Sequence, residues 1–358
     1  MTIFATAGSG LRALATPRLP VPRGPLSEVV IRAVAGPPSP IGLPLDPGRG
    51  VDLLADHDFQ LALYCCYELH YRGFDGVDPD WEWWPPLLTF RRSLEKAFEE
   101  RVRDEVGPVA APADVRLAIT DVIAGGSGPS LSGYMAEKGS LEEMREFCIH
   151  RSAYQLKEAD PHTWAIPRIT GEAKAAMVEI QADEYGGGVE TEMHSTLFAD
   201  TMEELSLDTN YGAYLDLIPG PTLATVNLVN LLGLHRRLRG ALVGHLALFE
   251  MTSVTPMGRY SAALKRLGLG ARARRFYDVH VVADAVHEVV ASERLAAGLV
   301  RAEPELAADV VFGAKAVMVI EERFARHLLD AWAQGKTSLL DPRPSEGRRA
   351  IDCGQAWD

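Results

Sequence analysis

The segment DVHVVADAVHE, residues 278–288, constrains the fold of this 358-residue chain more than any other feature. It places His280, Asp284 and His287 at spacings of four and three, with apolar residues between them. Because each residue of an α-helix turns by about 100°, the three side chains would share one helix face. A carboxylate buried between two imidazoles is costly unless something pairs with it, and a bound cation is the simplest partner. The alternative is an amphipathic helix with a His–Asp–His hydrogen-bonded ladder on its solvated side.

The composition is typical of a folded protein that handles small molecules. Hydrophobic residues make up 47% and charged residues 24% of the chain, and the formal net charge of −13 disfavours nucleic acid or an anionic membrane as the main partner. No apolar run approaches the roughly 18 residues of a membrane span, and the N-terminus lacks the apolar segment of a secretory signal. The four cysteines, Cys65, Cys66, Cys148 and Cys353, show no CxxC spacing. We therefore expect a cytoplasmic protein with reduced thiols.

The chain divides into four parts with different patterns. Residues 1–50 are rich in proline and glycine and lack periodicity, which predicts an extended, mobile arm. Residues 51–125 and 140–335 show the i, i+3, i+4 apolar spacing of helices and are separated by the break AGGSGPS. Residues 336–358 form a C-terminal tail. Since alternating β-branched runs do not stand out, we expect an all-α protein with a smaller N-terminal helical domain and a larger helical bundle.

The larger domain contains three helices that bear on function. TGEAKAAMVEIQADEYGGG predicts a helix that ends at three glycines. The apolar stretch over residues 221–253 predicts one long buried helix, and residues 271–300 predict the helix that carries the His–Asp–His triad.

Four further residues on these segments are candidate metal ligands. Glu250 follows seven almost wholly apolar residues, where an exposed glutamate is unusual. Glu184 lies where a helix meets the glycine run, and His194 begins the next apolar helix. Glu158 ends a helix before an Asp–Pro pair. Taken singly, each has an ordinary interpretation as a helix-end carboxylate, an acid near a turn, a structural histidine or a surface acid.

The combined set favours two iron ions. Four carboxylates carry −4, and two Fe²⁺ ions carry +4, so the complete site would be neutral and could be buried. Mixed carboxylate and imidazole ligands suit iron or manganese better than zinc. The chain contains no Glu-x-x-His motif, which argues against a ferritin-like protein and leaves another helical di-iron bundle open.

The seven candidate ligands resemble the ligand pattern of the heme-oxygenase-like di-iron oxidases and oxygenases, which include iron-containing redox enzymes. Three segments share this resemblance, namely HRSAYQLKEADPHTWAIPR, IQADEYGGG and HRRLRGALVGHLALFEMTS. The resemblance covers roughly residues 140–335 and implies a heme-oxygenase-like bundle with two Fe(II)/Fe(III) ions and O₂ as cosubstrate. The ligand set it implies is Glu184, His194, Glu250, His280, Asp284 and His287, with Glu158 as the extra ligand of its N-oxygenases. Residues 51–125 resemble the helical domain through which some members dimerise, so a homodimer is expected.

The resemblance implies an O₂-activating oxygenase of specialised metabolism. We expect N-oxygenation of an amino acid or amine, because Glu158 supplies the extra ligand and the N-terminal domain is present. The alternative on the same site is oxidative C–C cleavage or decarboxylation of an amino or fatty acid. A rival of another class is a helical protein that binds heme or a metal without turnover, but heme needs one or two axial ligands and no acid cluster. An external electron donor is compatible with either reaction.

Two residues are candidates for substrate binding, and no catalytic residue is expected beyond the metal ligands. Arg151 and Tyr154 lie seven and four residues before Glu158, on the same helix face. Arg151 could hold a substrate carboxylate, although the favoured interpretation is that it pairs with a structural acid. Other polar residues, namely Glu68, His70, His235 and His245, are interpreted as structural.

Helical facing also predicts how the ligands divide between the two ions. It groups His280 and Asp284 with Glu184, and it groups His194 and His287 with Glu250, leaving Glu158 to bridge or complete one site. Because Pro161 ends the helix after Glu158, this ligand should have the least rigid backbone.

Overall fold

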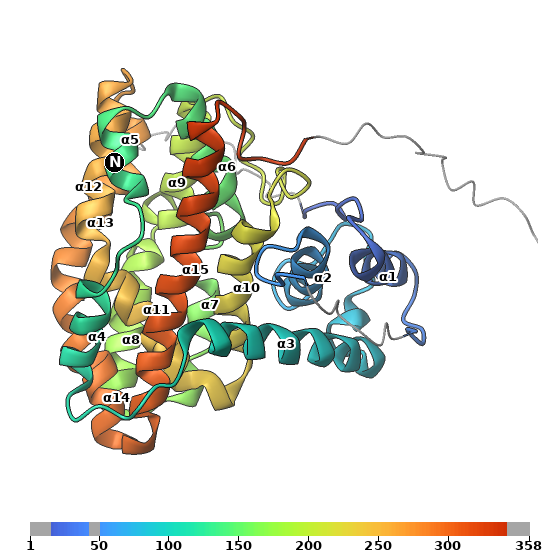
Figure 1. Cartoon of the computed structure of the whole chain (residues 1–358), viewed down its shortest axis with the longest axis horizontal. Helices are drawn as coiled ribbons and strands as arrows, with labels where there is room; N and C mark the ends of the chain where they lie inside the picture. Colours follow the sequence, from blue (N-terminus) through green and yellow to red (C-terminus); the bar gives the residue numbers. More distant parts are fainter. Residues whose placement is uncertain (1–15, 43–50, 342–358) are drawn as a thin grey trace, which may run out of the picture.

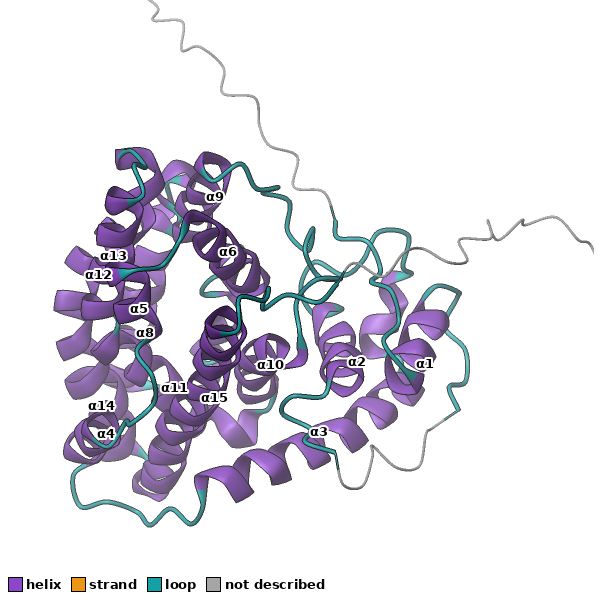
Figure 2. Ribbon diagram, turned by 45° about the horizontal axis from the view of Figure 1, so that its top comes forward, coloured by secondary structure: helices purple, strands orange, loops and turns teal. Residues whose placement is uncertain are grey.

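A computed structural model describes residues 16–42 and 51–341, and every regular element within these ranges is a helix. The prediction of an all-α protein is confirmed (Figures 1 and 2). Parts of the predicted arm and tail, residues 1–15, 43–50 and 342–358, lie outside the described residues, and so does Cys353. Across the described ranges, none of the helices combines the length and the hydropathy needed to cross a bilayer.

The N-terminal helices form a unit beside a larger bundle, drawn in blue to teal in Figure 1. This unit contains α1 (Pro25–Val34), α2 (His57–Glu68), η1 (Pro79–Trp83) and α3 (Pro85–Val106). Helix α3 reaches from the unit to α15 of the bundle. The two parts therefore touch along α2 and α3, since α2 also packs on α10.

Helix α1 contradicts the expectation that residues 1–50 lack regular structure. Its residues Val30 and Val34 are buried against the rest of the unit, and α1 packs on α2. The side chain of Asp58, on α2, accepts hydrogen bonds from the backbone N–H groups of Leu26 and Ser27 at 2.9 and 2.7 Å. A carboxylate supplied from another helix satisfies the first turn, and a local sequence pattern cannot reveal such a long-range cap.

The bundle contains the remaining helices. Its elements are α4 (Val115–Ala124), α5 (Leu131–Glu137), α6 (Leu141–Gln155), α7 (Asp160–Thr163), η2 (Ile166–Arg168), α8 (Gly171–Glu184), η3 (Gly186–Gly188), η4 (Glu190–Glu192), α9 (His194–Glu204), α10 (Gly220–Leu234), η5 (Arg236–Leu238), α11 (Arg239–Thr252), α12 (Val254–Arg266), α13 (Ala271–Val289), the π-helical η6 (Val290–Ala296), α14 (Ala297–Ala302), η7 (Pro304–Leu306) and α15 (Ala307–Ala333). Helix α4, which the sequence assigned to the smaller domain, packs on α11 and α15 of the bundle.

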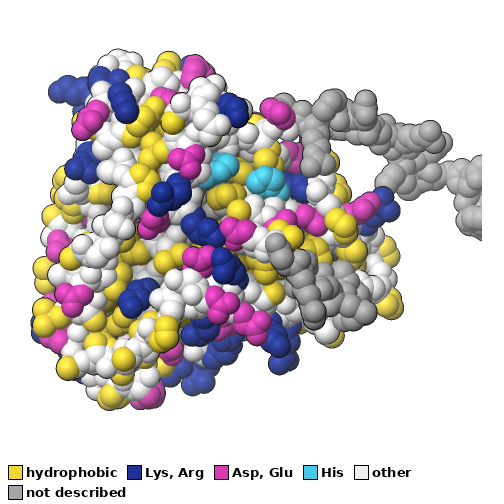
Figure 3. Space-filling view, in the orientation of Figure 1, with side chains coloured by type: hydrophobic (Ala, Val, Ile, Leu, Met, Phe, Trp, Pro, Cys, Tyr) yellow, Lys and Arg dark blue, Asp and Glu magenta, His cyan; other side chains and the backbone are white. Residues whose placement is uncertain are grey.

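Basic and acidic side chains are interspersed over the face of the molecule shown in Figure 3.

The predicted long helix over residues 221–253 is divided into α10 and α11. The chain bends at His235, whose φ and ψ of −105° and 111° are extended. Arg168 donates hydrogen bonds to the carbonyl oxygens of Gly233 and Leu234, which lose their helical partners at the bend. Hydropathy alone does not mark this bend, because apolar residues continue on both sides of it.

Helices α11 and α15 cross at very short range, which places α11 deep inside the bundle. Gly244 and Gly313 face each other's helix, and a Cβ atom at either position would overlap the backbone of Val310 or Ala241. Glycine is required at this crossing because only its bare backbone permits the approach.

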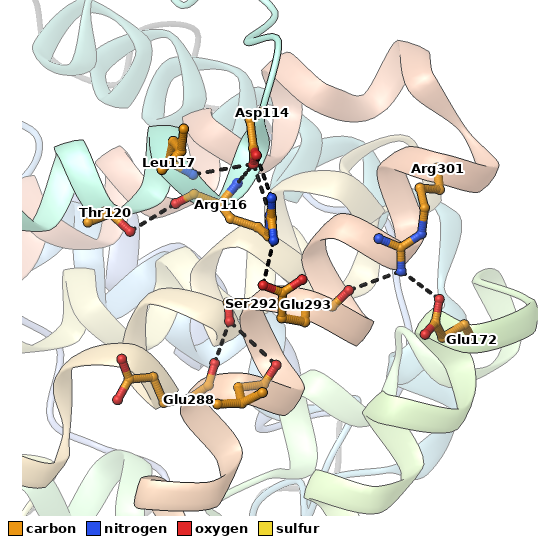
Figure 4. Close-up of polar contacts among 10 residues, drawn as sticks. Asp114, Arg116, Leu117, Thr120, Glu172, Glu288, Ser292, Glu293 and Arg301 are labelled. Atoms are coloured by element: carbon orange, nitrogen blue, oxygen red, sulfur yellow. Dashed lines mark hydrogen bonds and ion pairs between the residues drawn. The ribbon is translucent and has the colours of Figure 1, made fainter.

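The triad helix α13 continues directly into the π-helical segment η6. Figure 4 shows Ser292 donating to the carbonyl oxygens of Glu288 and Val289, at 2.8 and 3.4 Å. Arg116 of α4 pairs with Glu293 at 2.5 Å, and Arg301 of α14 donates to the Glu293 carbonyl at 3.0 Å. Arg301 also pairs with Glu172 of α8. The predicted helix over residues 271–300 is thus continuous but wider at η6, where neighbouring helices bind it.

Candidate metal centre

The seven predicted ligands lie together inside the bundle, although they come from five separate places in the chain. Glu158 occupies the turn after α6, Glu184 is the last residue of α8, and His194 is the first residue of α9. Glu250 lies in the last turn of α11, and the triad lies on one face of α13. Six of the seven are buried, and the side chain of Glu158 is 11% exposed.

Three consecutive glycines bring two of these ligands together. Gly186, Gly187 and Gly188 all have positive φ, at 63°, 61° and 85°. Residues with a Cβ rarely adopt this conformation, so the glycine run permits the sharp reversal between α8 and α9. As a result Glu184 and His194 approach each other, with the carboxylate Oε2 2.9 Å from the imidazole Nδ1.

The ligand atoms form two groups that share one residue. Glu158, Glu184, His194 and His280 each offer an atom within 4.8 Å of the others. Glu184 also belongs to a second group of the same dimension, with Glu250 and His287. We call these the Glu158 group and the Glu250 group.

Asp284 extends the Glu250 group. Its Oδ1 lies 3.7 Å from His287 Nδ1, and Glu250 Oε2 lies 3.3 Å from the same nitrogen. The structure agrees with the predicted division in placing His280 with Glu184 and His287 with Glu250. The division is wrong for His194, which lies with His280, and for Asp284, which lies with His287; Glu184 is the shared carboxylate. Helical facing describes one helix at a time and cannot place residues of different helices next to each other.

Two of the imidazoles are oriented from outside the groups. The Nδ1–H of His280 donates to the carbonyl oxygen of Phe276 at 2.7 Å, which directs Nε2 toward Glu158. The Nε2–H of His287 donates to Asp183 at 2.9 Å, which directs Nδ1 toward Glu250. Metal-bound histidines usually donate their second N–H to such an oxygen. The sequence analysis missed Asp183, although its position next to Glu184 was a signal.

Several buried polar atoms of the two groups have no hydrogen-bond partner in the described part of the chain. They are Glu158 Oε2, Glu184 Oε2, His194 Nδ1, Glu250 Oε2, Asp284 Oδ2 and His287 Nδ1. Some lie close to each other, but the angles do not fit hydrogen bonds. Since buried polar groups are nearly always satisfied, lone pairs that converge in this way fit a pair of cations.

The electrostatics of the carboxylates point the same way. Burial raises the pKa of Glu158 well above its usual range, and the nearby charges of Glu184 and Asp284 raise it further. Burial also raises the pKa of Glu250 to about 8. Burial and mutual repulsion therefore oppose the ionisation of Glu158 and Glu250 unless a cation lies beside them.

The shared carboxylate and its histidine neighbours behave differently. Burial opposes ionisation of Glu184, but the imidazoles of His194 and His280 outweigh it and lower its pKa to about 2. Burial lowers the pKa of His287, but its close approach to the Asp284 and Glu250 carboxylates raises it to about 11. A proton on His287 would thus balance part of the negative charge, and a cation would replace it.

A cavity of about 540 Å³ opens onto the candidate metal centre. Glu158, Glu184, Glu250, His280 and Asp284 all contribute to its lining. The rest of the lining is largely apolar and aromatic, and includes Phe147, Phe249, Met257, Tyr260 and Phe324. This volume suits a small organic molecule.

Both predicted substrate-binding residues line this cavity. Arg151 forms a two-pronged ion pair with Glu321 of α15, at 2.9 and 2.6 Å, so the interpretation that it pairs with an acid is confirmed. Tyr154 lines the same cavity, and burial, together with the charges of Glu158 and Glu184, raises the pKa of its phenol well above the usual value.

The residues interpreted as structural lie outside the two groups. Glu68 pairs with Lys157, and His70 lies 3.2 Å from Glu82. His235 contacts Glu95, whereas the ring of His245 hydrogen-bonds to His162 at 3.1 Å. None of these four residues joins the groups of ligand atoms found in the described chain.

A comparison with known proteins identifies the family. The model of the family described as iron-containing redox enzyme matches residues 145–322. Through this segment the chain belongs to the iron-containing redox enzymes. The matched segment begins on α6 and ends on α15, so it contains every candidate ligand. The expected heme-oxygenase-like bundle is confirmed, and iron is the metal that this family implies.

Among curated proteins, this chain is similar to the nitrosourea synthase of Streptomyces achromogenes subsp. streptozoticus. The two are 27% identical over 168 residues, which cover 47% of this chain and 36% of the relative. The match therefore spans about a third of the length of that protein.

Proposed function

We propose that this protein is a non-heme di-iron oxygenase that N-oxygenates a small amino acid or amine. One observation carries the proposal: both ligand groups line the same cavity, so a molecule bound there would contact the metal centre directly. Membership of the iron-containing redox enzymes supports iron as the metal.

The side chains present fit two iron ions. Glu158, His194 and His280 would hold one ion, Glu250, Asp284 and His287 the other, and Glu184 would serve both. The donor set of carboxylates and imidazoles is the kind that non-heme iron sites use. Once bound, the two ferrous ions would supply electrons for the reduction of O₂.

The chain itself would bind and orient the substrate. The aromatic lining excludes water from the reacting centre, which strengthens electrostatic interactions there. The Tyr154 phenol, whose raised pKa keeps it protonated, can donate a hydrogen bond to a substrate near Glu158. Arg151 and Glu321 can contact the carboxylate and the ammonium group of an amino acid, since both line the cavity.

The similarity to the nitrosourea synthase favours oxidation of a substrate nitrogen. The relative is named for a nitrosourea, a product that contains a nitrogen–oxygen bond. The Glu158 group also supplies the extra carboxylate that a di-iron N-oxygenase would use. The apolar lining around Phe249 and Phe324 favours a second candidate, which is oxidative cleavage of an amino or fatty acid with an apolar chain.

The test begins with anaerobic reconstitution with Fe(II), followed by O₂ uptake measured with a panel of amines, amino acids and fatty acids. We expect up to two iron ions per chain and substrate-dependent uptake with an amine or amino acid, with an N-oxygenated product by mass spectrometry. Uptake only with fatty acids would favour cleavage. One tightly bound zinc without iron-dependent uptake, or a Soret band from heme, would contradict the proposal.

A further inference from the structure

A second buried cluster lies next to the metal centre, and the reaction does not use it. The ammonium group of Lys157 lies 2.8 Å from Glu68 Oε2, and both side chains are fully buried. The Tyr211 hydroxyl donates to the same oxygen at 2.6 Å and is 2.8 Å from the Tyr64 hydroxyl. Lys157 also lies over the ring of Tyr71 at 4.2 Å. We call this group the Lys157 cluster.

The Lys157 cluster joins the metal centre to the N-terminal unit. Lys157 immediately precedes the candidate ligand Glu158, whereas Glu68 is the last residue of α2. The two neighbouring side chains therefore point to different clusters, one toward α2 and one toward the metal centre.

The turn that carries Glu158 is held at several points. Arg72, just after α2, donates to the carbonyl oxygen of Leu156 at 3.0 Å. Gln181 of α8 donates to the carbonyl oxygen of Ala159 at 3.1 Å. Ala159 has a φ of 73°, in the left-handed region that an alanine adopts only at a cost. Such a conformation persists where the surroundings impose it, and here they impose it on the residue after a ligand.

A buried ion pair is a poor device for stability alone. Removing two charges from water costs as much as their attraction returns, and a well-packed apolar pair often stabilises a protein more. In some proteins such pairs instead fix one arrangement of the elements that they join. Glu158 needs that restraint, since it lies outside a regular helix.

We propose that the Lys157–Glu68 ion pair positions Glu158 for metal binding, so that Lys157 and Glu68 are positioning residues supplied partly by the N-terminal unit. This inference rests on the proposed metal centre. Without the pair, the turn over residues 156–159 would relax and the Glu158 group would bind its ion more weakly. The Glu250 group, which lies on α11 and α13, would be unaffected.

The experiment is an anaerobic titration of the full-length protein with Co(II), followed by its visible spectrum, and repeated with Fe(II). Glu68→Gln removes the charge and keeps the shape of the side chain. Lys157→Met/Glu68→Gln removes both charges, so that no unpaired charge stays buried. Glu95→Gln is the matched control, because Glu95 is a buried acid of α3 that contacts Arg91 and His235 at 3.1 and 2.9 Å. It too joins the N-terminal unit to the bundle, but neither of its partners adjoins Glu158 in the chain, whereas Lys157, the partner of Glu68, does.

We expect wild type to bind two ions. Both Glu68 variants should bind one ion about 10-fold or more weakly and the other unchanged. Glu95→Gln should bind both ions normally, even where its thermal unfolding shifts as much as that of Glu68→Gln. If Glu68→Gln does not fold, the double variant decides. Normal binding by the Glu68 variants, or equal weakening in the control, would overturn the inference. A wild-type protein that binds no metal would instead contradict the proposed function.

Discussion

Adjacent residues of one turn, Lys157 and Glu158, belong to two buried clusters that differ in how their polar atoms are satisfied. In the Lys157 cluster, the ammonium group, the Glu68 carboxylate and two tyrosine hydroxyls bind one another. In the candidate metal centre, six buried nitrogen and oxygen atoms find no hydrogen-bond partner among residues 16–42 and 51–341. Both clusters are buried and both contain carboxylates, so burial and charge alone do not distinguish them.

The difference shows what each cluster can do. An unsatisfied buried polar group costs about 1–3 kcal/mol, and a charged one costs more. The metal centre contains several such groups, which a folded protein tolerates when a ligand restores their interactions. In the Lys157 cluster the charged pair needs no ligand, because Lys157 and Glu68 bind each other and Tyr211 donates to the same carboxylate. Several unsatisfied carboxylate oxygens that line one cavity therefore distinguish the candidate metal centre from the Lys157 cluster.

The largest effect should follow from the residue that both ligand groups share. Glu184→Ala should abolish the binding of both ions and lower oxygenase activity by more than about 100-fold, since a lost ligand costs more than the 10–100-fold of an outer contact. Metal content by elemental analysis and O₂ uptake measure this. The control is Glu179→Gln on the same helix, an exposed acid that pairs with Arg294 at 2.6 Å. Retention of two tightly bound ions in Glu184→Ala would show that the groups are independent.

Removing a ligand from one group should affect one ion. Glu158→Ala should keep the fold and the ion of the Glu250 group, lose the other ion and lower N-oxygenation about 100-fold. Asp284→Ala should keep the ion of the Glu158 group and lose the ion of the Glu250 group. Iron titration followed by Mössbauer spectroscopy distinguishes the two sites. If Glu158→Ala binds two ions and turns over normally, Glu158 is an ordinary acid, and the preference for N-oxygenation over C–C cleavage is lost with it.

The buried pair of His162 and His245, whose rings lie within hydrogen-bonding distance at 3.1 Å, can be tested through its dependence on pH. Burial lowers the pKa of His162 to about 4, from an ordinary value of 6.5. Its contribution to stability is therefore complete above pH 6.5 and decreases as the pH falls toward 4. We expect the difference in the free energy of unfolding between metal-free wild type and His162→Gln to decrease by about 2 kcal/mol from pH 7 to pH 5. Urea unfolding at both pH values measures this difference, and an unchanged difference would mean that His162 takes up its proton over the same pH range in the folded and the unfolded protein.

The smallest effect should come from outside the ligand groups. Asp183→Ala removes the oxygen that accepts the Nε2–H of His287. We expect about 10-fold weaker binding of one ion, at the low end for such contacts, because the Asp183 side chain is 60% exposed and water can replace it. Co(II) titration measures the change. A loss as large as that of Asp284→Ala would make Asp183 a ligand.

The sequence by itself determined the helical class and the identities of the candidate ligands. The spacing of His280, Asp284 and His287 requires a helix to bring them to one face, and α13 is that helix. Glu250 stood out because its neighbours are apolar. These signals are local, since they depend on periodicity and on the cost of a polar residue in apolar surroundings.

Only the tertiary structure decided which ligands meet. The sequence paired His194 with His287, whereas the fold pairs it with His280, because the reversal at the three glycines and the crossing of α11 with α15 set distances between helices. The same holds for α1, whose cap comes from Asp58, and for Lys157, whose partner lies 89 positions away in the chain. Periodicity specifies the face of one helix, but the packing of several helices, through close approaches and buried pairs, specifies which faces touch.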